Sequence, residues 1–86
     1  MTELEFDVLD ELYFIISFDD LNKILGIDES VLKNILFKFI KNEWVRCFLN
    51  DEEIMGYNEN DLPYNIHKYC YLASKKGLVI HNQRTE

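Results

Sequence analysis

Five polar or basic side chains recur at helical spacing between residues 29 and 42, where they could contact a nucleic acid. At about 100° per residue they fall on one face of a helix, opposite an apolar face. The five are Ser30, Lys33, Asn34, Lys38 and Lys41. Lysine ammonium groups suit phosphate oxygens, whereas a hydroxyl and an amide can pair with base edges. Lysines are also common on solvated helix faces, so the pattern alone fits a plain surface as well.

Two further side chains extend this polar face. Arg46 follows the helix in sequence and could support the phosphate backbone from the next element. Phe37 falls in the middle of the polar arc. An aromatic ring there could pack under a loop, touch a thymine methyl group or anchor a protein partner. The face is therefore predicted to bind double-stranded DNA or to dock a protein.

The charge of the chain is acidic overall but unevenly placed. The 86 residues carry a formal charge of −7. Residues 1–20 and 50–68 are strongly acidic, whereas residues 33–46 hold Lys33, Lys38, Lys41 and Arg46 against one carboxylate, that of Glu43. A DNA-binding protein can be acidic overall if the face that it presents is positive. The basic stretch coincides with the polar helix face.

Apolar periodicity predicts a first helix over residues 3–16. Phe6, Tyr13 and Phe14 lie outside its apolar stripe. Either the helix is well buried on all sides, or these rings contact a second subunit or another protein, since exposed aromatic patches often mark contacts.

Two more helices are predicted to follow, joined by a tight turn. Ser17 is a helix N-cap, and Gly26 supplies the positive φ that ends a helix of about eight residues. Asp28 is expected to cap the third helix, which runs to about Asn42. Helix-turn-helix motifs have this arrangement, and their second helix can lie in a DNA major groove. The residues expected to be buried are Leu21, Ile24, Leu25, Val31, Leu32, Ile35, Leu36, Phe39 and Ile40.

The chain after the third helix is predicted to form a β-hairpin with a long connection, followed by a short last helix. Strands are expected over residues 44–49 and 68–73, with a polar, acidic loop over residues 50–65 between them. Ser74 can cap the last helix, and Gly77 is expected to weaken it. The fold class is α+β, mostly α, in a single domain that spans residues 1–86.

No pattern for catalysis, metal or cofactor binding is visible, so an enzyme is the least favoured class. Cys47, His67, Cys70 and His81 are the soft metal ligands of the chain, and they lack the spacing of a closed zinc site. The apolar runs are far shorter than the ~20 residues of a membrane span. We expect a cytoplasmic protein that uses no cofactor and whose two cysteines stay reduced.

Four segments carry a resemblance to a known family. They are the L-x-x-I-L-G-I turn of residues 21–27, the V-L-K-N-I-L-x-x-F-I run of residues 31–40, the N-E-W-V of residues 42–45 and the Y-L-A-S-K-K-G of residues 71–77. In this order they resemble a winged helix-turn-helix domain of the small MarR/PadR-type transcriptional regulators.

That resemblance implies a three-helix core, a two-stranded hairpin wing and a short C-terminal helix. It implies a DNA-binding regulator, usually a homodimer on a palindromic site, with the third helix in the major groove. Glu43 stands where the family usually has Gly, so Asn42 is expected to take the left-handed turn instead. The alternative is an acidic winged-helix interaction module that binds a protein through Phe37 and does not bind DNA.

Overall fold

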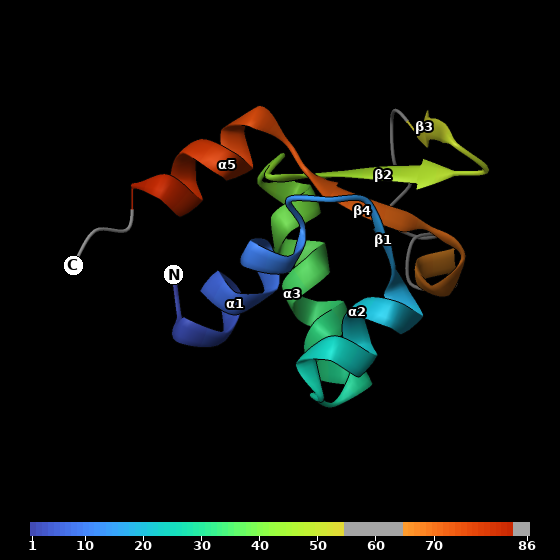
Figure 1. The fold of residues 1–86 in the computed structure, drawn as a ribbon, viewed down its shortest axis with the longest axis horizontal. Helices are drawn as coiled ribbons and strands as arrows, with labels where there is room; N and C mark the ends of the chain where they lie inside the picture. Colours follow the sequence, from blue (N-terminus) through green and yellow to red (C-terminus); the bar gives the residue numbers. More distant parts are fainter. Residues whose placement is uncertain (55–64, 84–86) are drawn as a thin grey trace.

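Three helices precede the sheet along the chain. The computed structural model describes residues 1–54 and 65–83. In it the helices are α1 (Glu3–Glu11), α2 (Phe18–Leu25) and α3 (Glu29–Lys41). They pack on one side of the sheet, and the core lies between the two (Figure 1). Fully buried members of this core include Val8, Leu9, Leu12, Phe18, Leu21, Leu32, Leu36, Phe39, Cys47 and Tyr71.

The sheet is antiparallel, with the strand order β1-β4-β2-β3. The strands are β1 (Ile16–Ser17), β2 (Val45–Leu49), β3 (Glu52–Ile54) and β4 (Cys70–Ala73). The predicted pairing of the two strands expected over residues 44–49 and 68–73 is confirmed: β2 pairs with β4, with Val45 opposite Ala73 and Phe48 opposite Cys70. The three-helix core, the hairpin and a final helix together give the winged-helix architecture predicted above.

The first helix is shorter than the predicted span of residues 3–16. Leu12 is its C-cap, and the Leu12 carbonyl accepts a hydrogen bond of 2.8 Å from the Ala73 amide. Ile16 then pairs with Tyr71 in the sheet. The apolar run before Ser17 therefore leaves the helix, because its backbone is needed to join β4.

Helix α2 matches the prediction at both ends. The Ser17 hydroxyl accepts a 3.2 Å hydrogen bond from the Asp20 amide, and Gly26 ends the helix at φ 61°. Ile24 was expected to be buried, and that prediction is wrong because 58% of the residue is exposed. It lies on the outer side of a helix that needs only one apolar stripe.

Helix α3 begins after Asp28, as predicted, although the Asp28 side chain makes no capping hydrogen bond. Val31 was predicted to be buried, and it is 37% exposed in the first turn, before the helix reaches the core. The other five apolar residues predicted for this helix are buried: Leu32, Ile35, Leu36, Phe39 and Ile40.

The end of α3 corrects the prediction for Asn42. Asn42 has φ −84°, and Glu43 takes the left-handed conformation at φ 63°. The Trp44 amide donates to the Phe39 carbonyl and the Glu43 amide donates to the Ile40 carbonyl. This is the Schellman pattern, which places the positive φ one residue beyond the C-cap. The rings of Phe39 and Trp44 supply its apolar contact, with centroids 5.6 Å apart.

The predicted acidic loop contains a strand that the sequence did not reveal. Asn50 and Asp51 have φ values of 52° and 68°, which suit a two-residue turn between strands. The turn sends the chain back as β3, where Glu53 lies opposite Phe48. The other part of the predicted loop, residues 55–64, lies outside the described residues.

A short 3-10 helix, η1 (Ile66–Lys68), stands where the second strand was expected to begin. The strand starts later, at Cys70. Ile66 is fully buried, and its carbonyl accepts a 2.6 Å hydrogen bond from the Tyr71 hydroxyl.

The last helix, α5 (Lys75–Asn82), is capped by Ser74 as predicted, and its hydroxyl accepts a 3.0 Å bond from the Gly77 amide. Helix α5 lies against α1 (Figure 1). In the described parts of the chain, no helix combines the length and apolar character needed to cross a bilayer.

Candidate nucleic-acid interface

The polar face of α3 is present, and most of it is exposed. Ser30, Asn34 and Lys41 are exposed, whereas Lys33 is partly buried. Within residues 1–54 and 65–83, neither Lys33 nor Lys41 forms an ion pair. Their ammonium groups are therefore the cations of this helix that a phosphate could approach without displacing a carboxylate.

Lys38 is engaged inside the molecule. Its Nζ lies 2.7 Å from Oε2 of Glu5, whose side chain is only 8% exposed. The hydrogen bond from Lys38, followed by the bond from the Thr2 amide, holds the pKa of Glu5 below its ordinary value. Glu5 and Thr2 also form a capping box at the start of α1. The predicted phosphate contact of Lys38 thus competes with a structural ion pair that ties α3 to α1.

Arg46 is engaged as well. Its Nε and one terminal nitrogen donate to the two carboxylate oxygens of Glu53, at 2.9 and 2.7 Å. The guanidinium carbon also lies 5.3 Å from the ring centroid of Phe48. The hydrogen bonds from Arg46 hold the pKa of Glu53 below its ordinary value, so this carboxylate is charged at neutral pH. The charge of Arg46 is therefore already paired with that of Glu53.

Phe37 is partly buried and packs against the hydrophobic core. This packing is against the core rather than under a loop, and contact with a thymine methyl group or a protein partner stays a prediction. Its ring offers only part of its surface to a DNA base or a protein partner.

Phe6 and Tyr13 both contact His81 within the molecule, while Tyr13 remains 39% exposed. The Phe6 ring stacks on His81 with centroids 4.1 Å apart. The Tyr13 hydroxyl lies 2.7 Å from Nδ1 of His81. His81 is buried, and Oδ1 of Asp10 lies 3.4 Å from its other ring nitrogen. These contacts join α1 to α5, so the two rings hold the C-terminal helix in place.

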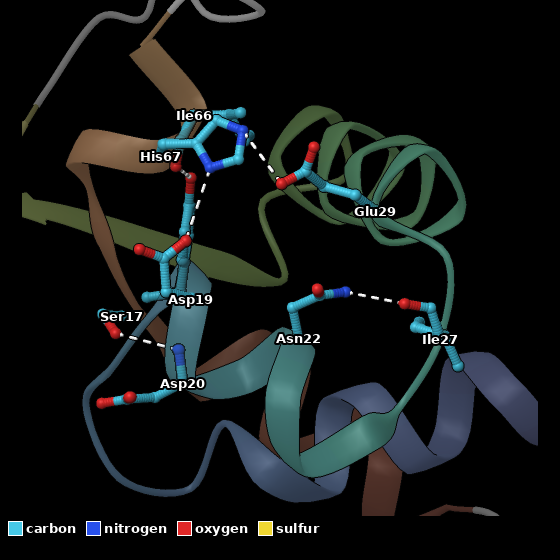
Figure 2. A network of polar contacts seen from close by, with 9 residues as sticks. Ser17, Asp19, Asp20, Asn22, Ile27, Glu29, Ile66 and His67 are labelled. Carbon is cyan, nitrogen blue, oxygen red and sulfur yellow. Dashed lines mark hydrogen bonds and ion pairs between the residues drawn. The ribbon is translucent and has the colours of Figure 1, made fainter.

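His67 joins η1 to the first turns of α2 and α3 (Figure 2). One ring nitrogen lies 3.5 Å from a carboxylate oxygen of Asp19, and the other lies 3.4 Å from a carboxylate oxygen of Glu29. The ring also meets Phe18 edge-on at 4.4 Å between centroids. The start of β4 is therefore fixed against both helices of the helix-turn-helix motif.

Asn22 sets the turn between those helices. Its side-chain amide donates a 2.9 Å hydrogen bond to the Ile27 carbonyl, across the left-handed Gly26 (Figure 2). A buried or half-buried carbonyl in a turn needs such a donor. This bond orients α3 relative to α2.

No cluster of three or more metal-ligating side chains occurs among residues 1–54 and 65–83. Cys47 on β2 is buried and Cys70 on the neighbouring strand β4 is partly buried, and no disulfide joins them.

Three residues of this region escaped the sequence prediction: Glu5, Glu53 and His67. The first had a signal, since Thr2-x-x-Glu5 is a capping-box pattern. The sequence signal for Glu53 is weaker. The Asn50–Asp51 pair suits a tight hairpin, and such a hairpin brings residues 46 and 53 to neighbouring strands. Nothing in the local sequence indicates that His67 meets Asp19 and Glu29, which lie far away along the chain.

Comparison with known proteins defines the fold. No protein-family model matches the chain, and no curated protein matches its sequence. Among solved structures it is similar to the multiple antibiotic resistance repressor MarR, with a TM-score of 0.72 and 22% identity over 96% of this chain. The apo form of wild-type MarR from E. coli gives the same TM-score and identity. The chain spans about half the length of these proteins, 53% and 54%. The chain thus has the winged-helix fold of MarR.

Proposed function

We propose that this protein is a DNA-binding transcriptional regulator that places α3 in the major groove of double-stranded DNA. The observation that carries the proposal is the exposed polar face of α3, with Lys33 and Lys41 outside any ion pair in the described parts of the chain. The fold shared with a repressor supports it. In this proposal both lysines contact phosphates, and Ser30 and Asn34 read base edges.

The salt dependence of DNA binding tests the proposal. Fluorescence anisotropy with a pool of random-sequence duplexes should show binding that weakens as salt rises, because phosphate contacts release counterions. The K33A/K41A variant removes two cations from the face. It should bind more weakly, and the slope of log K against log salt should fall by about 2.

A matched control removes the same charge elsewhere. The K75A/K76A variant loses two exposed lysines of α5, outside the polar face of α3. It should keep the wild-type slope to within about 0.5, since slope follows phosphate contacts rather than net charge. Equal slopes for the two double variants, or no salt-dependent binding by the wild type, would refute the proposal.

We also propose a homodimer, by way of apolar residues other than Phe6 and Tyr13. Phe14 is 83% exposed and Ile15 is 51% exposed, after the end of α1, and Val79 on α5 is 47% exposed. Helix α5 packs against α1, and contiguous exposed apolar surface often marks contacts. Sedimentation equilibrium should show a dimer that the F14S variant dissociates, and a wild-type monomer at about 100 μM would contradict this.

The alternative, a protein-docking module without DNA binding, has less support. It rests on the acidic first helix, the acidic wing and Phe37, and the Phe37 ring is partly buried against the core. The same anisotropy experiment separates the two functions, because only the first requires salt-dependent binding to a duplex.

A further inference from the structure

The Arg46–Glu53 pair has the shape of a phosphate contact. Two guanidinium nitrogens donate to two carboxylate oxygens of Glu53 at 2.9 and 2.7 Å. This bidentate geometry is the one that arginine also offers to phosphate. The Glu53 carboxylate therefore occupies the guanidinium edge that a DNA phosphate would use.

The sheet register holds Glu53 in this place. The turn at Asn50 and Asp51 folds β3 back along β2, and Glu53 lies opposite Phe48. Side chains alternate between sheet faces, so Arg46, Phe48 and Glu53 share one face. Val45 and Cys47 point into the core instead.

The pair is exposed enough to be exchanged. The side chain of Arg46 is 44% exposed and that of Glu53 is 30% exposed. Exposed ion pairs contribute little to stability, so a phosphate that also gains from counterion release can replace the carboxylate. The pair of Lys38 with Glu5 differs, because Glu5 is buried and also caps α1.

From this geometry we propose that Glu53 is an internal competitor of DNA phosphate for Arg46. In the protein without DNA, the guanidinium is held by Glu53. On DNA, a backbone phosphate takes its two hydrogen bonds and the carboxylate turns to solvent. Glu53 thereby lowers the affinity for any duplex. This inference rests on the proposed DNA-binding function.

The Glu53→Gln variant tests the competition. Glutamine keeps the size of the side chain but removes the charge that holds Arg46. We expect it to bind a random-sequence duplex about three- to fivefold more tightly than the wild type, which is the fold-change expected from losing one exposed ion pair. The slope of log K against log salt should stay close to that of the wild type, because Arg46 contacts phosphate in both complexes.

Glu52→Gln is the matched control. Glu52 is exposed on the same strand and lies opposite Leu49, and its loss changes the net charge equally. It should leave the affinity for the duplex close to that of the wild type. The R46Q/E53Q variant should lose the gain of E53Q, because the competed cation is absent. Circular dichroism melts of all variants check that the hairpin stays folded.

The outcomes separate the two hypotheses. Suppose that the wild type binds with a salt-dependent affinity but E53Q binds no more tightly than E52Q. The competition is then wrong and the proposed function stands. The same holds if R46Q/E53Q binds as tightly as E53Q. If no variant binds any duplex, both fail.

Discussion

Gly77 is the residue at which close packing most restricts the choice of side chain. A Cβ atom at this position would lie 2.1 Å from the Trp44 carbonyl oxygen, which is backbone and cannot rotate away. The same carbonyl accepts a 2.8 Å hydrogen bond from the Ser74 amide. Gly77 therefore lets the first turn of α5 lie directly on the segment between α3 and β2. The helix weakness expected from glycine is offset by this contact.

The Gly77→Ala variant should be less stable than the wild type, although alanine favours a helix by about 1 kcal/mol. A contact of 2.1 Å with fixed backbone places the cost near the upper end of the ~1–3 kcal/mol for overpacking, at about 2–3 kcal/mol, so we expect a net loss of about 1–2 kcal/mol. Urea unfolding measures the free energy. Lys75→Ala, exposed in the same turn, is the control and should change little. A G77A protein as stable as the wild type would contradict the close contact.

Glu5 gives the stability a definite dependence on acid. Its folded-state pKa lies below the ordinary value of 4.5, first because of the hydrogen bond from Lys38. A group with a lowered folded pKa stabilises fully above its unfolded pKa, and this stabilisation is lost as pH falls through the folded pKa. The Glu5–Lys38 pair should therefore contribute at neutral pH and vanish in acid.

The Glu5→Gln variant should be less stable than the wild type by about 1–2 kcal/mol near neutral pH, since a buried charged hydrogen bond is lost. The difference should shrink below the ordinary pKa of 4.5. Urea unfolding across this range measures it. Asp7→Asn, exposed on the same helix, should show no such convergence. A difference that stays constant with pH would show that the charge of Glu5 is not what matters.

At the scale of elements, one side chain bridges the turn of the helix-turn-helix motif. Asn22 donates across Gly26 to the Ile27 carbonyl. Removing a donor leaves that carbonyl without its partner and costs about 0.5–1.5 kcal/mol. The Asn22→Ala variant should lose this much unfolding free energy, while the exposed neighbour Lys23→Ala loses little. Equal stabilities of the two variants would mean that the turn is set by Gly26 alone.

The elements that the sequence predicted are those with local chemical signals. Ser17 and Ser74 cap helices through their own hydroxyls, and Gly26 supplies a positive φ that few residues tolerate. Each signal acts within three or four residues, so it can be read without knowing the tertiary structure.

The elements that it missed depend on distant partners. Strand β1 has two residues, Ile16 and Ser17, too few for an alternating pattern to show, and it exists because β4 pairs with it. Strand β3 is three residues of acidic sequence that only β2 recruits. An apolar run beside a helix therefore predicts more helix, and an acidic strand predicts a loop.

For the candidate site, helical periodicity placed the α3 face correctly, with Ser30, Asn34 and Lys41 exposed. It could not show that Lys38 and Arg46 carry carboxylate partners. Glu5 lies 33 positions from Lys38 in the chain, and only the packing of α1 on α3 brings them together.

At the scale of the whole molecule, the formal charge of −7 acts against the compact state. Salt screens this repulsion over about 10 Å at 0.1 M. Raising sodium chloride from about 0.02 M to about 0.5 M should therefore raise the melting temperature by a few degrees, as differential scanning calorimetry can measure. The Lys75→Glu variant, which is more negative, should gain more from the same salt. A melting temperature that falls with salt would mean that specific ion pairs outweigh the net repulsion.

The pairing of β1 with β4 has a consequence for how the chain acquires its fold. Ile16 pairs with Tyr71, and the Leu12 carbonyl accepts from the Ala73 amide, so the sheet closes between segments more than fifty positions apart. Closing so long a loop is entropically costly and slows folding. Helices α1 to α3 are complete in sequence by residue 41, whereas β1 has no strand beside it until residue 71 is available. During synthesis on the ribosome, the helices can therefore pair early, and the sheet is completed only when nearly the whole domain has emerged.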